Sequence, residues 1–386
     1  NYYDDPILVP VLRVLSIILF TGAFNSIQNA YISRNLMFKK LFTSSLGAIL
    51  ISGVLGIVTA YKGLGIWALV IQQISNQISI TVIMWFTVKW RPSLAFSLRK
   101  VKVLFSYSWK LLVSSLLNVF YLDLRTLIIG KVYTPSVLGY YNRGQQFPKV
   151  IVNNIDGSIQ SVMLPTLSAY QDNRKKVKAM MRRAIVTSSF FIFPMMIGMA
   201  VIAEPLVSLV LTDKWLPSVP FLQIFCLSYA VRPIHTANLQ AINALGRSDI
   251  FLKLEVLKKI VGLVTLAITV PLGVYAIAIG QLVSGILSSI INAYPNKHLL
   301  DYSYKEQWVD IVPSLLIAIV MGAIVYCFNF LRLQSWQLLA VQLSIGAITY
   351  ICLAKLLKID SFNYLINTVK EFFRESKKKY DPYQEV

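Results

Sequence analysis

The sequence predicts an all-α protein that crosses a membrane many times. The chain has 386 residues, a mean hydropathy of +0.62 and only 14% charged residues, against roughly 25% in an average soluble domain. Apolar runs of about 18 to 25 residues recur along the whole chain, and each is long enough to cross about 30 Å of hydrocarbon as a helix. A membrane β-barrel would instead show short segments of alternating hydropathy.

Eleven candidate spans follow one another along the chain, and the connections between them alternate between short loops and longer basic ones. The predicted boundaries are residues 8–32, 41–61, 66–88, 105–130, 136–168, 184–211, 219–245, 252–271, 274–296, 308–330 and 335–354.

The distribution of basic residues predicts the orientation in the membrane. The net charge is +20, with 27 basic residues on one set of loops and the C-terminal tail and only 4 on the opposite set. Basic loops stay in the cytoplasm, so the C-terminus is expected inside and Asn1 outside. Because the charges lie between apolar runs, membrane topology explains them and no nucleic-acid partner is expected.

An internal repeat predicts two lobes. LGIWALVIQQISNQI, from Leu64, matches LGVYAIAIGQLVSGI, from Leu272, at an offset of 208 residues, and a weaker pair begins at Val9 and Val219. The repeat is parallel, as in transporters whose halves are related by an axis along the membrane normal. The later lobe has six predicted spans and the earlier one three. We therefore expect that the chain lacks three N-terminal helices of an inferred fourteen.

This reading divides the chain into five parts. They are half of an N-terminal lobe with three helices, a cytoplasmic inter-lobe loop, a six-helix C-terminal lobe, two extra helices and a basic cytoplasmic tail, over residues 1–88, 89–104, 105–297, 298–356 and 357–386. Within the tail, apolar residues recur on one face between Asp360 and Lys379, which suits a helix lying on an anionic leaflet. A solvated tail is an equally open interpretation.

Polar residues interrupt the stretch GYYNRGQQFPKVIVNNIDGSIQ, which begins at Gly139. Spacings of three and four place six of them on one stripe of a helix, namely Arg143, Gln146, Lys149, Asn153, Asp156 and Gln160. Asn142 broadens the stripe. Lipid cannot solvate such a face, so it must meet a water-filled cavity or partner helices. The alternative interpretation is a polar seam that holds helices together.

Cations elsewhere also fall within or close to predicted spans. Besides Arg143 and Lys149 they are Arg13, Lys110, Arg125 and Arg232. Charge in hydrocarbon is costly unless it is paired or hydrated, so these six are candidates for function. His235 and Asn238 share a helix face with Arg232, and Gln281, Ser284, Ser288 and Asn292 form an uncharged stripe. Several polar faces in one bundle predict a shared cavity.

A basic cavity inside a membrane suits an anionic cargo. The guanidinium of arginine matches phosphate because its planar fork donates two hydrogen bonds. We expect Arg143 and Lys149 to hold a pyrophosphate, with Arg125 and Arg232 as further cavity cations. A polar wall suits sugar hydroxyls, and its candidates are Asn142, Gln146, Asn153, Asp156, Gln160, His235 and Asn238. With two histidines and three cysteines without metal-like spacing, neither a metal site nor a cofactor is expected.

Several motifs resemble one transporter family. YYNR from Tyr140, PTLS from Pro165, the opening YYDDP from Tyr2, and the loop from Ser33 to Lys40 are similar to those of the polysaccharide-exporting flippases. These form the O-antigen and colanic-acid exporter branch of the multidrug/oligosaccharidyl-lipid/polysaccharide exporter superfamily. The resemblance implies fourteen helices in two lobes. It also implies translocation of undecaprenyl-pyrophosphate-linked repeat units across the bacterial inner membrane by alternating access, for O-antigen, capsule or exopolysaccharide. Expected partners are that lipid-linked oligosaccharide, membrane lipids and polysaccharide polymerase or assembly proteins.

Two other functions stay open. A drug/cation antiporter of the same superfamily would need acids in the cavity, and Asp123, Asp156 and Glu204 are the available ones. A membrane glycosyltransferase, polymerase or ligase would need a sizeable outer loop or an acidic motif. The outer loops here are a few residues long, and neither Asp-x-Asp nor a Gly-rich phosphate loop occurs. The sequence therefore predicts a transporter and not an enzyme.

Overall fold

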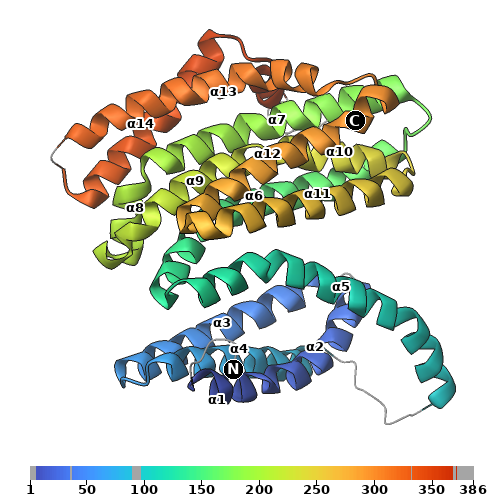
Figure 1. Cartoon of the computed structure of the whole chain (residues 1–386), viewed down its shortest axis with the longest axis vertical. Helices are drawn as coiled ribbons and strands as arrows, with labels where there is room; N and C mark the ends of the chain where they lie inside the picture. The colour runs from blue at the N-terminus through green and yellow to red at the C-terminus, as the bar shows by residue number, and fades with distance from the viewer. Residues whose placement is uncertain (1–5, 35–36, 89–96, 332, 368–370, 372–386) are drawn as a thin grey trace, which may run out of the picture. The chain divides into compact units, whose positions relative to one another are not determined.

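The structure, a computed structural model, describes residues 6–34, 37–88, 97–331, 333–367 and 371. Predictions that concern residues 1–5, 35–36, 89–96 and 372–386 lie outside these, as does the side chain of Lys110. Within the described part, the regular elements are all helices, drawn in Figure 1. The prediction of an all-α chain is confirmed there.

The chain divides into two compact units, Asn1–Ser115 and Leu116–Val386. The first unit holds the start of α5 (Leu98–Val132) and the helices before it, which are α1 (Leu8–Leu15), α2 (Ile17–Arg34), α3 (Phe38–Tyr61) and α4 (Ile66–Thr87). The second unit holds the rest of α5 and α6 (Pro135–Ser168), α7 (Arg174–Val201), α8 (Ala203–Leu211), α9 (Val219–Ala230), α10 (Arg232–Ala244), α11 (Ser248–Thr269), α12 (Val274–Leu299), α13 (Tyr304–Cys327) and α14 (Ser335–Leu356). Three short 3-10 segments, Asp213–Ser218, Val270–Leu272 and Phe328–Phe330, connect helices of this unit, and residues 360–367 are helical.

Seven helical segments of the described chain are long and apolar enough to cross a membrane. They are Leu8–Ile32, Lys39–Tyr61, Ile66–Thr87, Arg174–Val201, Val274–Leu299, Tyr304–Phe330 and Ser335–Leu356. The other four predicted ranges coincide with α5, α6, α9 with α10, and α11. α9 and α10 have only 12 and 13 residues, and α5, α6 and α11 carry several charged side chains. The counts of eleven and fourteen spans and the arrangement in lobes stay predictions.

Two helices begin earlier than hydropathy predicts. α5 begins at Leu98 and not at residue 105, and α7 begins at Arg174 and not at residue 184. Both extensions are rich in lysine and arginine, which are good helix formers but do not enter hydrocarbon. Hydropathy therefore locates only the apolar part of each helix.

The stronger of the two sequence repeats has a local structural counterpart. Gly65 and Gly273 both have positive φ, 54° and 107°, and each stands directly before a helix, α4 and α12. Glycine adopts this backbone conformation without the steric cost that other residues meet. The Leu-Gly pairs in the two copies thus mark the same kind of helix start.

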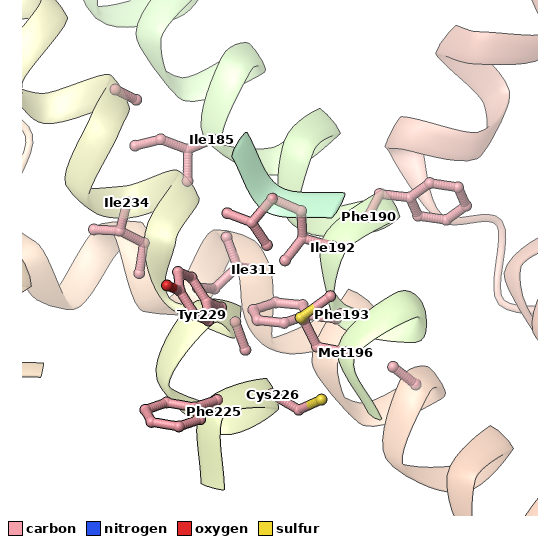
Figure 2. Close-up of a cluster of buried hydrophobic side chains, with 14 of the residues drawn as sticks. Ile185, Phe190, Ile192, Phe193, Met196, Phe225, Cys226, Tyr229, Ile234 and Ile311 are labelled. Carbon is pink, nitrogen blue, oxygen red and sulfur yellow. The ribbon is translucent and has the colours of Figure 1, made fainter. Parts of the chain in front are cut away.

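The core of the second unit lies between α7, α9, α10 and α13. Figure 2 shows Phe193 and Met196 of α7 beside Phe225 of α9 and Ile311 of α13, all buried. Cys226 is buried among them with a free thiol, as a small apolar side chain would be. This core holds α10 in place between α6, α7 and α12, which it contacts.

Gly144 lets α6 approach α9 closely. A Cβ at this position would lie 2.6 Å from Cβ of Phe221 and 2.8 Å from the backbone nitrogen of Leu222. Small residues allow such backbone approach in membrane bundles. We expect Gly144→Ala to lower the free energy of unfolding by about 2 kcal/mol, because overpacking displaces backbone.

Gly157 offers a matched control on the same helix, because nothing lies within 4 Å of a Cβ placed there. Gly157→Ala should leave stability unchanged or slightly higher. Unfolding of the two purified variants in detergent, followed by circular dichroism, compares them. Equal stability of both variants would contradict the close packing of α6 on α9.

Candidate functional site

The polar stripe predicted on α6 divides between two environments. Asn142, Arg143, Gln146, Lys149, Asn153 and Gln160 are exposed on the second unit, whereas Asp156 is buried. Nη1 of Arg143 donates to Oε1 of Gln146 at 2.7 Å, and its guanidinium carbon lies 5.4 Å from the centroid of the Trp215 ring. The exposed members therefore form a polar surface of α6, and Arg143 is fixed near Trp215 in the segment Asp213–Ser218.

Asp156 is bonded to a different cation from those considered in the sequence. From the sequence, the cations expected to neutralise Asp156 are Lys149, two turns away on the same helix, and Arg125 on the preceding helix. In the structure, Oδ2 of Asp156 instead accepts from Nε of Arg232 on α10 at 3.0 Å. The carboxylate side chain is 4% exposed and the arginine side chain is 44% exposed. Sequence spacing could not reveal this pair, because it joins residues 76 positions apart.

Arg232 is the first residue of α10, immediately after a helix break. α9 ends at Ala230 and α10 begins at Arg232, with Pro233 in its first turn and no side-chain cap. Proline is tolerated there because its missing N–H would have no intrahelical partner. The break leaves backbone N–H groups and the positive end of the α10 dipole at this point. Broken helices in transporters direct such ends toward anionic groups.

A cavity of about 320 Å³ lies at this break, and we call it the cationic cavity. Its walls come from α5, α9, α10, α11 and α12, together with Val231 between α9 and α10. The lining residues are Tyr121, Arg125, Ser228, Tyr229, Val231, Arg232, His235, Glu255, Lys258, Lys259, Gln281, Ser284, Gly285 and Ser288. The volume is at the lower end of the range for small-molecule sites, about 300–1,000 Å³, and suits part of a ligand such as a headgroup.

Four cations and one carboxylate line the cationic cavity: Arg125, Arg232, Lys258, Lys259 and Glu255. Nζ of Lys258 pairs with Oε1 of Glu255 at 2.5 Å, and the lysine side chain is only 9% exposed. Nζ of Lys259 lies 5.8 Å from the centroid of the Tyr121 ring. Within the described part of the chain, neither Arg125 nor Lys259 forms an ion pair. The lining is net positive even with the Lys258 ion pair, so it favours an anion.

The uncharged part of the wall comes largely from α12. Gln281, Ser284 and Ser288 of the predicted stripe line the cavity, and Oε1 of Gln281 accepts from the hydroxyl of Tyr141 at 2.9 Å. These hydroxyl and amide groups can hydrogen-bond to a polar ligand beside the cations.

His235 and Asn238 belong to a hydrogen-bonded network rather than to one surface. His235 lines the cavity, and Asn292 lies 2.9 Å from its Nδ1. Asn238 is fully buried behind it, where its side chain bonds to Gln307 at 2.7 Å and to Asn296 at 2.8 Å. The network joins α10, α12 and α13 and fixes the helix that carries Arg232. No cluster of three or more His, Cys, Asp or Glu side chains suited to a metal occurs in the part of the chain that the structure describes.

The structure thus brings together Arg125 and Arg232 of the four predicted cavity cations and leaves Arg143 and Lys149 outside the cavity wall. Lys258 and Lys259 were not predicted as cavity residues, because the count of basic residues assigned them to the cytoplasmic side although both fall within the predicted span 252–271. They lie on α11, one turn beyond Glu255. Opposite charges at positions i and i+3 of a helix can pair with each other. This spacing was the feature of the sequence from which a paired lysine inside the span could have been predicted.

Comparison with known proteins identifies the family. The family described as "Polysaccharide biosynthesis protein" matches residues 1–220, more than half of the chain. The chain belongs to this family. It is a multi-pass membrane protein, with seven apolar helical segments in its described part.

Relatives and a solved structure agree with this assignment. Lipopolysaccharide biosynthesis protein WzxC of Escherichia coli K12 is 25% identical over 83% of this chain and 68% of its own length. Teichuronic acid biosynthesis protein TuaB of Bacillus subtilis is 23% identical over 92% and 74%. The fold is similar to that of a solved structure, lipid II flippase MurJ in an inward closed conformation, with a TM-score of 0.70 and 15% identity over 91% of this chain and 74% of that one.

Proposed function

We propose that this polysaccharide biosynthesis protein translocates a lipid-linked oligosaccharide across the bacterial inner membrane, for a surface polysaccharide such as O-antigen, capsule or exopolysaccharide. The observation that carries the proposal is the cationic cavity, where four basic side chains meet the uncapped start of α10. Names of similar proteins support the cargo class, since one is a lipid II flippase and others act in lipopolysaccharide and teichuronic acid biosynthesis.

In this proposal the diphosphate of the cargo binds in the cationic cavity. Arg125 and Lys259 are free of ion pairs within the described residues, and Arg232 uses one of its N–H groups on Asp156. A guanidinium has five N–H donors, so Arg232 keeps others for phosphate oxygens. Gln281, Ser284 and Ser288 would meet the first sugar. Arg143 and Lys149 lie on the exposed face of α6, outside the wall of this cavity, and this binding does not require them.

Alternating access would move the diphosphate between the two sides of the membrane. We propose that the two sequence repeats form lobes that rock against each other, with the basic loops and the C-terminus in the cytoplasm. Partner polymerase or assembly proteins would act on the exported repeat unit. A cation as cargo is disfavoured, because the single carboxylate of the cavity wall is already paired with Lys258.

Binding by the purified full chain tests the proposal. In nanodiscs of a neutral lipid, native mass spectrometry should show undecaprenyl diphosphate bound at least about tenfold more tightly than undecaprenol, because only the former offers charge-assisted hydrogen bonds. The difference should shrink as salt is raised. Tetraphenylphosphonium, a lipophilic cation, should not compete. Equal binding of the two lipids, or displacement by the cation, would rule out the diphosphate site.

A further inference from the structure

A second, larger cavity of about 820 Å³ lies in the second unit, where α7 and α13 begin and α14 ends. We call it the α7–α13 cavity. It also borders residues 357–361 and Tyr364, so the short helix after α14 forms one wall. It shares no lining residue with the cationic cavity and has no part in the function proposed above.

Five cations line the α7–α13 cavity: Lys175, Lys178, Arg182, Arg183 and Lys358. Arg182 is neutralised, because its Nη2 lies 2.5 Å from Oδ1 of Asp310. Lys178 has a weaker acidic neighbour, Glu306, at 3.8 Å. Among the residues that the structure describes, neither Asp310 nor Glu306 forms an ion pair with Lys175, Arg183 or Lys358.

Both carboxylate oxygens of Asp310 are engaged by groups other than Lys175, Arg183 and Lys358. Its Oδ2 accepts from the hydroxyl of Tyr302 at 2.7 Å, while its Oδ1 meets Arg182. Asp360 is the other carboxylate on the lining. Within the described residues, Lys175, Arg183 and Lys358 form no ion pair, so the cavity keeps a net positive charge.

Arg183 is held in a geometry that leaves its donors available. Its guanidinium carbon lies 4.1 Å from the centroid of the Tyr364 ring. This cation–π contact uses no N–H donor of the guanidinium in a hydrogen bond, so those groups can donate to an anion.

Ser361 adds a buried polar group to the wall of this cavity. Its side chain lines the cavity and is 4% exposed, and its Oγ has no hydrogen-bond partner among the described residues. A buried hydroxyl without a partner is costly, so a ligand oxygen in this cavity would satisfy it.

Apolar surface continues from the cavity along α13. Val309 and Pro313 line the cavity, and Leu316 and Val320 lie one and two turns further along the same exposed face. Cations at the helix ends and an apolar strip toward the helix middle match an amphiphile with an anionic head.

We propose that the α7–α13 cavity binds the phosphate headgroup of an anionic membrane lipid, with Arg183, Lys175 and Ser361 as its ligands and the acyl chain along α13. A bound headgroup joins the helix at residues 360–367 to the starts of α7 and α13. Free phosphate offers the same oxygens without the acyl chain, and the experiment separates the two sources.

The test uses the purified full chain in detergent, with native mass spectrometry as the readout. Phosphatidylglycerol is titrated against phosphatidylcholine, whose headgroup carries no net charge. The site variant is Lys175→Gln with Arg183→Gln. The control variant, Lys297→Gln with Lys305→Gln, removes the same charge from exposed positions that do not line the cavity. Circular dichroism checks that both variants fold as the parent does.

Phosphatidylglycerol should bind more tightly than phosphatidylcholine, and the site variant should lose about tenfold in affinity for it, as expected for lost charge-assisted hydrogen bonds. The control variant should lose less than about twofold, a loss that screening of surface charge explains. Equal affinity for both lipids, or equal losses in both variants, would overturn the proposal. So would displacement of the lipid by about 10 mM inorganic phosphate, since the acyl chain would then add nothing.

Undecaprenyl diphosphate provides a further readout, because the site variant should keep its affinity for that lipid. A parallel loss would mean that one cavity binds both ligands, contrary to the proposal. Loss of phosphatidylglycerol alone supports a separate headgroup site, whether or not the cationic cavity binds a diphosphate.

Discussion

Replacing Arg125 and Lys259 together with glutamine is expected to weaken binding of undecaprenyl diphosphate about a hundredfold. Both side chains line the cationic cavity and neither forms an ion pair within the described residues. Their removal should therefore cost binding more than folding. Each charge-assisted hydrogen bond that is lost lowers affinity by roughly tenfold or more.

The control for this variant removes the same charge from the exposed face of α6, through Arg143→Gln with Lys149→Gln. Native mass spectrometry of the three purified chains, titrated with undecaprenyl diphosphate, compares their affinities. Wild-type affinity in the control and a large loss in the cavity variant would support the cationic cavity as the diphosphate site. A loss confined to the control would instead favour the stripe that the sequence predicts. Equal losses would indicate only a general attraction to positive charge.

Much of the fold could be predicted because a helix that crosses hydrocarbon needs a run of about 20 apolar residues. Seven apolar segments are helical and long enough to span, and each is visible as an apolar run. The ends of the helices were harder to predict from the sequence. α7 begins at Arg174 within a basic segment that hydropathy assigns to a loop, because transfer to hydrocarbon and helix propensity are different properties.

The candidate site was predictable where chemistry is local to one helix. Arg232, His235 and Pro233 lie close together in sequence, and the first two line the cavity at a helix break. The partner of Asp156 was not predictable, because it depends on how α6 packs against α10. Helical periodicity places a side chain only to within a broad sector, and here a residue on the edge of the polar stripe is buried.

Lys258 shows a different limit. Counting basic residues by loop assigned it to the cytoplasmic side, although its side chain is 9% exposed and paired with Glu255. The positive-inside rule sums charge over a region and does not ask whether a given lysine has an acid one turn away. Arg143 and Lys149 were singled out instead because they lie on a polar stripe within an otherwise apolar stretch.

The ion pair between Asp156 and Arg232 gives the second large expectation, an asymmetry in stability. Arg232→Gln should lower the free energy of unfolding by about 3 kcal/mol, because it leaves a buried carboxylate without its cation. Asp156→Asn should cost only about 1 kcal/mol, because the remaining arginine is 44% exposed and water can solvate it. The double variant should resemble Asp156→Asn, since it contains no unpaired buried charge.

Unfolding of the four chains in detergent, as a double-mutant cycle, measures this asymmetry. A costlier Asp156→Asn than Arg232→Gln would contradict the assignment of the carboxylate as the buried partner. Independent, additive losses would show that the 3.0 Å contact carries no coupling.

The same chains also bear on transport, because Asp156 and a bound diphosphate would compete for the donors of one guanidinium. Asp156→Asn is therefore expected to bind undecaprenyl diphosphate more tightly than the parent does. An exporter that must also release its cargo gains from a carboxylate that shares the arginine, and weaker binding in Asp156→Asn would mean that the carboxylate orients Arg232 toward the diphosphate rather than competing with it.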